Sequence, residues 1–231
     1  MRCVIFKSVF LNLVITTTIL LVSNNLFSQR NMFLLNAGPN FPLSDFRDDE
    51  FNSGSAATGF IAGGRYVYQV NNKGFGLFMG ADFCHNGLLK SEQDEMKHLL
   101  QLRNLGRDLT VNYFSYLNVP VNMGLFLTYT PIEQFSWFAE IGCGPDYFKL
   151  TKMVVTIDNE KLTYYFKHSI EMGYKLGGGM LIHKKFNVGM YYYGMGTHKV
   201  EGHTEYDGRS NDLAPFVQEV SLLTFNFGLI F

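Results

Sequence analysis

Five charged residues occupy positions from which they could act together inside a folded chain. Each lies on the polar phase of a segment in which apolar residues alternate with small or polar ones: Arg65, Asp82, Glu140, Glu171 and Lys175. Alternate residues of a strand share a face, so strands would turn these side chains to one side of a sheet. Buried charges need partners. We predict an internal ion-pair network that plugs a barrel lumen, and the alternative reading is a gate or a proton-coupled site.

Other motifs for chemistry are weak. The tract His198, Glu201, His203, Glu205, Asp207 contains metal-ligating residue types, but its spacing matches no compact zinc signature such as HExxH. His168 and Ser169 are neighbours, and neighbours along a strand face opposite sides, so they cannot form a catalytic dyad. No GxSxG is present, and no basic run suggests nucleic-acid binding. We predict no catalytic residue, cofactor or metal, and a protein that is not an enzyme.

The clearest structural element is the C-terminal segment. Its odd positions are large and apolar from Leu223 to Phe231, and its even positions are polar or small, as at Thr224 and Asn226. This alternation is typical of a barrel strand with one face toward lipid. The terminal residues Phe227, Leu229 and Phe231 resemble the signal that the outer-membrane barrel-assembly machinery reads during insertion.

The same alternation recurs in seven upstream segments, at residues 31–41, 60–70, 75–84, 113–127, 136–149, 169–182 and 186–197. Short connections (71–74, 128–134, 183–185) alternate with long ones (42–58, 85–112, 150–164, 198–215). This pattern predicts an all-β fold, an eight-stranded antiparallel transmembrane β-barrel of the up-and-down kind. Short turns lie on the periplasmic side of such barrels, so both termini are predicted to be periplasmic in the cell outer membrane.

Composition supports this fold over a soluble barrel. Charged residues make up only 17% of the chain, whereas aromatic residues reach 16% and glycine is abundant. Glycines gather on the polar face, where they make room for bulky neighbours such as Arg65, Tyr191 and Tyr193 in a narrow lumen. The soluble alternative would turn the apolar face inward around a ligand. Cys84 and Cys143 fall on opposite faces, so we predict no disulfide between them.

The N-terminus reads as a secretory signal. Arg2 and Lys7 precede the apolar stretch from Val9 to Val22, and we place cleavage after Ser28. The alternative is an uncleaved anchor, for which the stretch is short. The predicted division is a signal peptide at 1–28 and a barrel domain at 29–231. Within the second long connection, residues 91–106 predict a surface helix that either docks a partner or packs over the barrel mouth.

Two segments carry a family resemblance. Tyr116 to Val121 reads YLNVPV, and Trp137 to Pro145 reads WFAEIGCGP. The chain resembles the small outer-membrane β-barrel proteins of Bacteroidetes, a group that includes PorT-like secretion accessory proteins. The resemblance implies a structural or interaction role, such as an accessory subunit of a secretion or assembly complex, with outer-membrane lipid as the surrounding partner. The alternatives are a lipid-modifying enzyme and a narrow channel.

Overall fold

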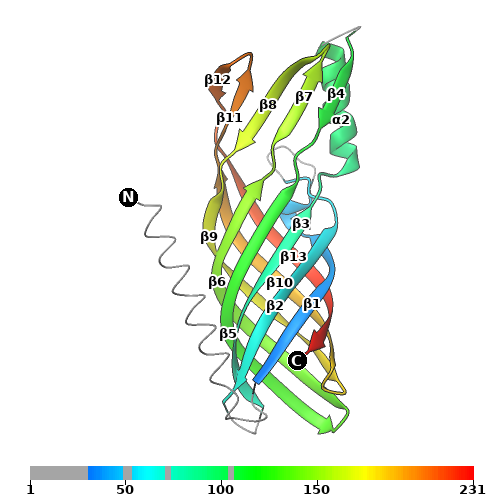
Figure 1. Cartoon of the computed structure of the whole chain (residues 1–231), viewed down its shortest axis with the longest axis vertical. Coiled ribbons are helices and arrows are strands. Elements are labelled where there is room, and N and C mark those ends of the chain that lie inside the picture. The colour runs from blue at the N-terminus through cyan, green and yellow to red at the C-terminus, as the bar shows by residue number, and fades with distance from the viewer. Residues whose placement is uncertain (1–30, 49–53, 71–73, 104–106) are drawn as a thin grey trace, which may run out of the picture. The chain divides into compact units, whose positions relative to one another are not determined.

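Eight antiparallel strands close into a barrel in the part of the chain that the computed structural model describes, residues 31–48, 54–70, 74–103 and 107–231. The predicted signal peptide, residues 1–28, lies outside the described residues. Around the barrel the strands follow the order β1-β13-β10-β9-β6-β5-β3-β2 (Figure 1). Their bounds are β1 Asn31–Pro42, β2 Gly59–Gln69, β3 Phe75–Asn86, β5 Tyr116–Ile132, β6 Phe135–Leu150, β9 Ser169–Ile182, β10 Phe186–Val200 and β13 Phe216–Ile230. The predicted fold class is confirmed.

The register between strands sorts side chains into an inner and an outer face. Met79 of β3 lies opposite Met123 of β5, and both side chains are exposed on the outside of the barrel. One residue further along, Phe78 lies opposite Gly124, and the Phe78 side chain is buried inside. Cys84 is buried and Cys143 is exposed, and both are free thiols. The alternation read from the sequence therefore describes the two faces of the wall.

A second sheet continues the barrel wall beyond one rim. Its five strands follow the order β12-β11-β8-β7-β4, with bounds β4 Leu109–Asn112, β7 Met153–Ile157, β8 Glu160–Phe166, β11 Gly202–Tyr206 and β12 Arg209–Asp212. The prediction that 150–164 and 198–215 are loops is wrong. These strands extend the barrel strands that precede or follow them, and the pair β7–β8 closes through a tight turn at Asp158 and Asn159, both with positive φ. We call this five-stranded sheet the extension.

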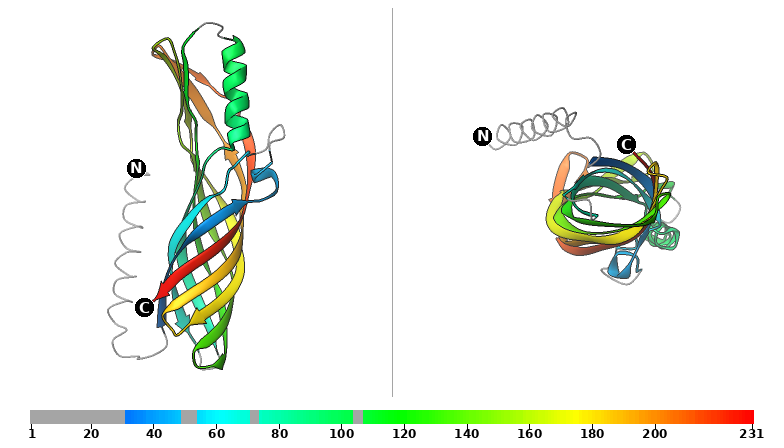
Figure 2. Two further views of the ribbon diagram at one scale, coloured as in Figure 1. Left: turned by 90° about the vertical axis from the view of Figure 1, so that its right-hand side faces the viewer. Right: turned by 90° about the horizontal axis from the view of Figure 1, so that it is seen from below.

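Helix α2, Lys90–Arg103, accompanies the extension. It confirms the predicted helix at 91–106, and residues 104–106 lie outside the described part. Figure 2 shows α2 standing alongside the extension, to the side of the barrel mouth. Met96 packs against the core, and the Tyr113 hydroxyl donates to the backbone oxygen of Gln93 at 2.6 Å. No helix among the described residues is long and apolar enough to cross a membrane.

Aromatic side chains pack together at the rim below the extension. The short 3-10 helix η2, Ser44–Phe46, places Phe46 in the core with no exposed surface. The Phe46 ring meets the Tyr116 ring edge-on, with centroids 5.0 Å apart, and Tyr116 also packs on Phe148. The Tyr116 hydroxyl donates to the backbone oxygen of Gly54. The described part of the connection between β1 and β2 thus anchors this end of the barrel through the buried Phe46 side chain.

Candidate functional site

Four of the five predicted charged residues meet in the middle of the barrel. Arg65 of β2 pairs with Glu140 of β6 through the Arg65 Nη1 and Glu140 Oε2 atoms. Lys175 of β9 bridges the two carboxylates, with its Nζ 2.9 Å from Glu140 Oε1 and 3.5 Å from Asp82 Oδ2 of β3. Two cations therefore face two carboxylates across the lumen. We call this set, Arg65, Asp82, Glu140 and Lys175, the ion cluster.

Two tyrosines of β10 complete the surroundings of the ion cluster. Arg65 Nη1 donates to the Tyr191 hydroxyl at 2.9 Å, and the Tyr193 hydroxyl donates to Asp82 Oδ2 at 2.9 Å. The Lys175 Nζ also lies 4.4 Å from the centre of the Tyr191 ring, and the Arg65 Cζ lies 4.6 Å from it. These contacts are of the cation–π kind. The rings and charges together form a plug across the lumen.

The ion cluster is buried and balanced in charge. The side chains of all four members are at most 6% exposed. Two charges of each sign compensate one another, which is the condition under which charges remain buried in a low-dielectric interior. Removal of one member would leave an uncompensated buried charge. The arrangement is suited to holding the barrel closed.

Glycines make the space that the plug occupies. A Cβ on Gly177 would lie 2.2 Å from Cδ1 of the Tyr191 ring, and a Cβ on Gly80 would lie 2.7 Å from Cβ of Arg65. Both distances are far shorter than real carbon contacts, so a side chain at either position would collide with the plug. The predicted role of the inward glycines is confirmed at these positions.

Glu171 does not belong to the ion cluster. It lies opposite Asp146 in the register between β6 and β9, yet its side chain is exposed. The reason is the neighbouring strand: β10 pairs with β9 only as far as Gly194 opposite Tyr174, and it bulges between Gly194 and Thr197. Glu171 lies beyond the point where this ladder ends, and period-two alternation alone could not locate that point.

A second buried pair was missed in the sequence. His198 of β10 and Asp146 of β6 have fully buried side chains, with His198 Nε2 3.1 Å from Asp146 Oδ2 and 3.0 Å from the Met195 backbone oxygen. The His198 ring also stacks on Phe148 at 4.7 Å. The bulge shifts the inward phase of β10, so His198 turns into the barrel instead of lying in a solvated loop. Gly194 and Gly196 are the sequence feature that could have indicated a bulge at this point of β10.

The remaining candidates for chemistry lie apart. His168 stacks on Tyr147, with ring centroids 5.3 Å apart, and His203 stacks on Tyr165 in the extension at 5.1 Å. Within the described ranges, no group of three or more His, Cys, Asp or Glu residues is placed to hold a metal ion. The tract that contains metal-ligating residue types is thus split between a barrel strand and the extension.

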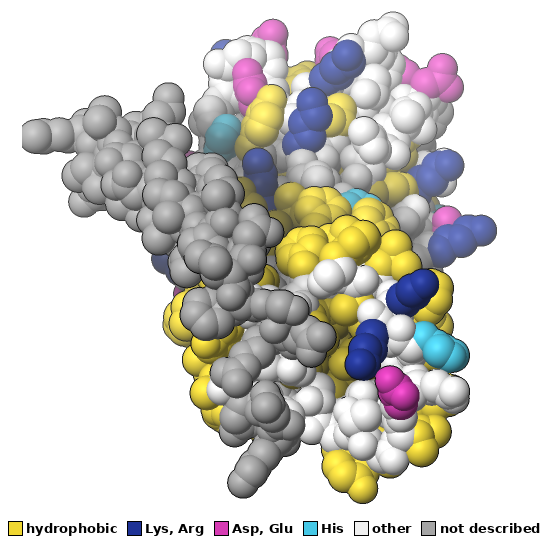
Figure 3. All heavy atoms as spheres, turned by 60° about the horizontal axis from the view of Figure 1, so that its bottom comes forward, with side chains coloured by type: hydrophobic (Ala, Val, Ile, Leu, Met, Phe, Trp, Pro, Cys, Tyr) yellow, Lys and Arg dark blue, Asp and Glu magenta, His cyan; other side chains and the backbone are white. Residues whose placement is uncertain are grey.

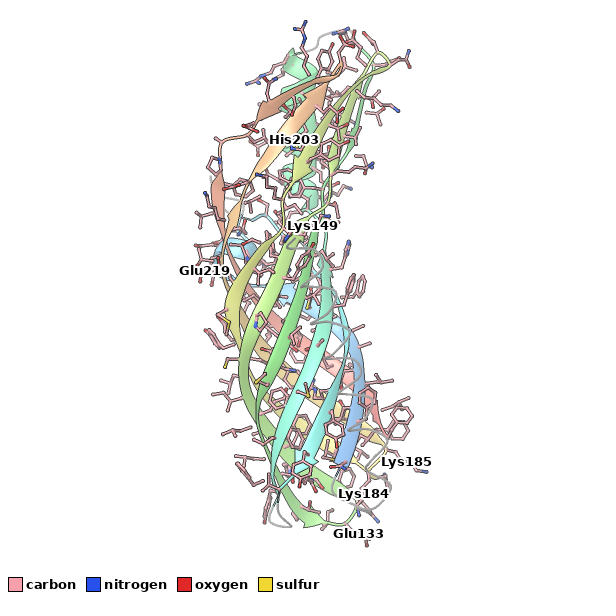
Figure 4. The ribbon with its side chains drawn as sticks, turned by 60° about the vertical axis from the view of Figure 1, so that its left-hand side comes forward. Glu133, Lys149, Lys184, Lys185, His203 and Glu219 are labelled. Atoms are coloured by element: carbon pink, nitrogen blue, oxygen red, sulfur yellow. The ribbon has the colours of Figure 1, made fainter. Side chains whose placement is uncertain are left out.

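The outside of the barrel carries an apolar belt. Figure 4 places Glu133, Lys184 and Lys185 at the end with short turns, and Lys149 and Glu219 near the opposite rim. Between these levels, large apolar side chains stay exposed on every barrel strand, and Figure 3 shows hydrophobic side chains on the part of the wall that is visible in that view. Residues Phe227, Leu229 and Phe231, which carry the predicted assembly signal, point outward with 61%, 46% and 68% of their surface exposed.

Solved structures of outer-membrane proteins are similar to this chain. A major outer membrane protein from Thermus thermophilus matches with 13% identity and a TM-score of 0.50, over 88% of this chain and 100% of that chain. OprG from Pseudomonas aeruginosa matches with 13% identity and a TM-score of 0.48, over 88% and 97%. Ail, the attachment invasion locus protein of Yersinia pestis, matches with 13% identity and a TM-score of 0.45, over 88% and 100%.

No protein-family model and no curated protein matches the chain. At these identities the structural likeness bears on the fold alone, and the Thermus protein agrees with the barrel described above. Membership of the PorT-like group of Bacteroidetes stays a prediction from the YLNVPV and WFAEIGCGP segments.

Proposed function

We propose that this chain is an integral outer-membrane protein whose barrel is plugged and whose extension makes contacts outside the cell. The apolar belt carries the proposal, because a soluble barrel would not leave so many large side chains in water. On β6 the outward residues from Phe135 to Tyr147 are uncharged. At ~3.3 Å per residue and a strand tilt of ~40°, this stretch rises ~30 Å. A bilayer core is about equally thick.

The proposed orientation puts the start of the first barrel strand and the end of the last one in the periplasm. Backbone hydrogen bonds join Phe33 and Phe231 in both directions, at 3.0 and 2.9 Å, so the first and last strands end side by side. They do so at the rim with the short turns, which faces the periplasm in barrels of this kind. The extension and α2 then stand on the extracellular side. The outward aromatic end at Phe231 is available to the assembly machinery during insertion.

Thiol labelling tests the membrane location and the orientation. In the proposed state, Cys143 lies in the belt and reacts with a bulky maleimide only after the protein is unfolded. In a Cys143→Ala background, Ser210→Cys in β12 is expected to react on intact cells, and Lys184→Cys only after the outer membrane is permeabilised. Labelling of Cys143 in membranes as fast as Ser210→Cys would contradict the membrane location, and labelling of Lys184→Cys on intact cells would reverse the orientation.

The biological role that we propose is structural or interactive, as a subunit beside another outer-membrane protein. The buried, charge-balanced ion cluster favours a closed barrel over a conduit. The exposed part of α2 offers a contact surface, since Leu99 and Leu102 lie one turn apart and are 53% and 54% exposed. Apolar side chains on a polar helix commonly mark the anchors of a helix-mediated contact.

A stoichiometric partner would identify the complex. The native protein is purified in mild detergent, and any partner present in equal amount is measured again with Leu99→Ser/Leu102→Ser. We expect this variant to lose the partner and the control Lys97→Ser/Gln101→Ser, on the same helix, to retain it. If the wild-type protein purifies alone, the subunit role is wrong, and bilayer conductance and lipid-hydrolysis assays then test the channel and the lipid-modifying enzyme.

A further inference from the structure

The ladder between β9 and β10 is interrupted in the barrel wall directly below the extension. Pairing of the two strands ends at Tyr174 opposite Gly194. Beyond that point, residues 168–173 of β9 and 195–200 of β10 are not paired with each other among the described residues, and pairing resumes only between β8 and β11 of the extension. Each strand keeps its other neighbour, since β9 stays paired with β6 and β10 with β13 beyond the bulge. We call the two unpaired stretches the seam.

The seam exists because the inward and outward positions of β10 are exchanged at its bulge while those of β9 are not. In the bulge Gly196 takes a φ of 89°, a conformation that suits glycine. Beyond it, His198 is fully buried inside the barrel. Four residues along each strand from the Tyr174–Gly194 pair, the residue opposite His198 is Ile170, which is 56% exposed on the outside. Opposite residues of a regular ladder share a face, so the two strands are out of phase here.

The strands stay in contact along part of the seam through packing. A Cβ on Gly196 would lie 3.0 Å from the Met172 backbone oxygen, and a Cβ on Gly173 would lie 3.1 Å from the Met195 Cα. Glu171 and Met172 are neighbours on opposite faces of β9, yet both side chains are exposed. This part of β9 is therefore accessible on both faces. Segments with few backbone bonds and exposed side chains open locally at a low free-energy cost.

A buried pair of side chains connects the two sides of the seam. His198 of β10 reaches Asp146 of β6, with its Nε2 3.1 Å from Asp146 Oδ2, and both side chains are fully buried. Because β9 lies between β10 and β6 in the barrel, the pair spans the strand to which β10 is not bonded. The His198 ring also stacks on Phe148 of β6, with centroids 4.7 Å apart. Its Nε2 lies 3.0 Å from the Met195 backbone oxygen, so the same ring also contacts the bulge.

We propose that the barrel wall opens at the seam and that the His198–Asp146 pair is the latch that holds it shut. Without the latch, β10 can move away from β9 above Gly194, because no ladder opposes the movement. The plug stays in place during such an opening, since Tyr193 lies opposite Lys175 in the intact ladder below the seam. This device goes beyond the proposed function, because it depends on the barrel wall and on no partner.

Hydrogen exchange of the full chain in detergent micelles, followed by NMR, tests the seam. The comparison is between the backbone amides that face β10 in two stretches of β9, residues 169–173 in the seam and residues 175–181 in the ladder. We expect the amides in the seam to exchange at least ~10-fold faster, because they take part in no ladder and open locally. Equal protection of the two stretches would show a continuous ladder and would overturn the inference.

Thiol labelling in the same micelles tests the latch. Met195 is 1% exposed and borders the seam, so Met195→Cys places a buried thiol there. A Cys143→Ala background leaves Cys84 of β3, which is also buried, as the reference thiol. When Asp146→Asn is added, we expect a small neutral methanethiosulfonate to reach the introduced thiol at least ~10-fold faster, because the latch no longer opposes local opening. The labelling rate of Cys84 should not change.

The matched control is His168→Gln. His168 also borders the seam, but it is exposed and its ring stacks on Tyr147. This variant should leave the labelling of the introduced thiol unchanged. If Asp146→Asn also leaves that rate unchanged, the buried pair holds nothing shut and the latch is wrong. If Asp146→Asn speeds labelling of Cys84 by the same factor, the whole barrel has loosened, which also overturns a latch that acts at the seam.

Discussion

At the scale of single residues, the ion cluster depends on Glu140, the member of its two carboxylates that contacts both cations. The variant Glu140→Ala leaves Arg65 and Lys175 with Asp82 as the sole acid of the cluster. We expect the free energy of unfolding to fall by about 3–5 kcal/mol, the usual cost of breaking a buried ion pair from one side. Urea unfolding of the barrel in detergent, followed by the heat-dependent shift in gel mobility, measures this change.

The control for this prediction is Glu171→Ala. Both residues are glutamates on the polar phase of neighbouring strands, but Glu171 is exposed beyond the end of the β9–β10 ladder. Its removal should change the unfolding free energy by less than ~0.5 kcal/mol, as is usual for exposed positions. Equal losses in the two variants would mean that the cluster has no special role in stability.

A second residue-scale prediction concerns the tip of the extension. The Arg107 Nε donates to Asp158 Oδ2 at 2.6 Å and the Asp108 backbone N–H donates to Oδ1 at 2.9 Å, and these bonds hold the pKa of Asp158 below its ordinary value. Because the pKa of Asp158 is lowered in the folded state, the Arg107–Asp158 pair stabilises the β7–β8 turn fully at pH values above the unfolded-state pKa of Asp158. That support is lost as pH falls through the lower, folded-state pKa.

The measurement is an NMR titration of the Asp158 carboxyl carbon. With Arg107→Gln we expect the pKa of Asp158 to rise toward its ordinary value, while the bond from Asp108 keeps part of the depression. Asp212 in β12 makes no contact with Arg107 among the described contacts and serves as the reference carboxylate. An Asp158 pKa that Arg107→Gln leaves unchanged would show that the pair does not form in solution.

At the scale of elements, the inward glycines of β9 set how closely the wall can approach the plug. Gly177→Ala would place a Cβ 2.2 Å from the Tyr191 ring and 2.5 Å from the Met190 backbone oxygen. We expect a loss of about 1–3 kcal/mol from overpacking, read from the same unfolding experiment. Gly87→Ala is the control, because a Cβ there meets no atom within 4 Å. Equal stability of the two variants would refute this account of the packing.

The extension shows where sequence reasoning at the scale of elements fails. Barrel strands are long, and their alternation over many residues predicts both faces. The strands β4 and β12 have four residues each, and so few residues carry too little periodicity to separate a strand from a loop. The bulge in β10 was missed for a related reason. After Gly194 it exchanges the inward and outward positions of the strand, so His198 points inward, and the alternation before the bulge does not predict this.

At the scale of the whole molecule, the sequence predicted the closed barrel because one physical pattern repeats eight times. Apolar residues outside and small or polar residues inside follow from lipid on one side and a narrow lumen on the other. The ion cluster was predictable in part for the same reason, since a charge such as Lys175 on the inner phase of a strand must meet partners across the lumen. The contacts of Tyr191 and Tyr193 depend on how far the strands are shifted along one another, and only the register in the folded barrel gives that shift.

The last prediction follows from the apolar belt and concerns whether lipid or water surrounds the barrel. Leu176 in the middle of β9 and Leu102 on α2 are both 54% exposed, so a soluble protein would treat them alike. In a bilayer, Leu176→Arg should cost about 2–4 kcal/mol, because the charge lies at mid-membrane depth. Leu102→Arg should cost less than ~0.5 kcal/mol, because its side chain is in water. Unfolding in lipid vesicles compares the two variants, and equal losses would place both leucines in the same solvent and remove the argument for a membrane-embedded barrel.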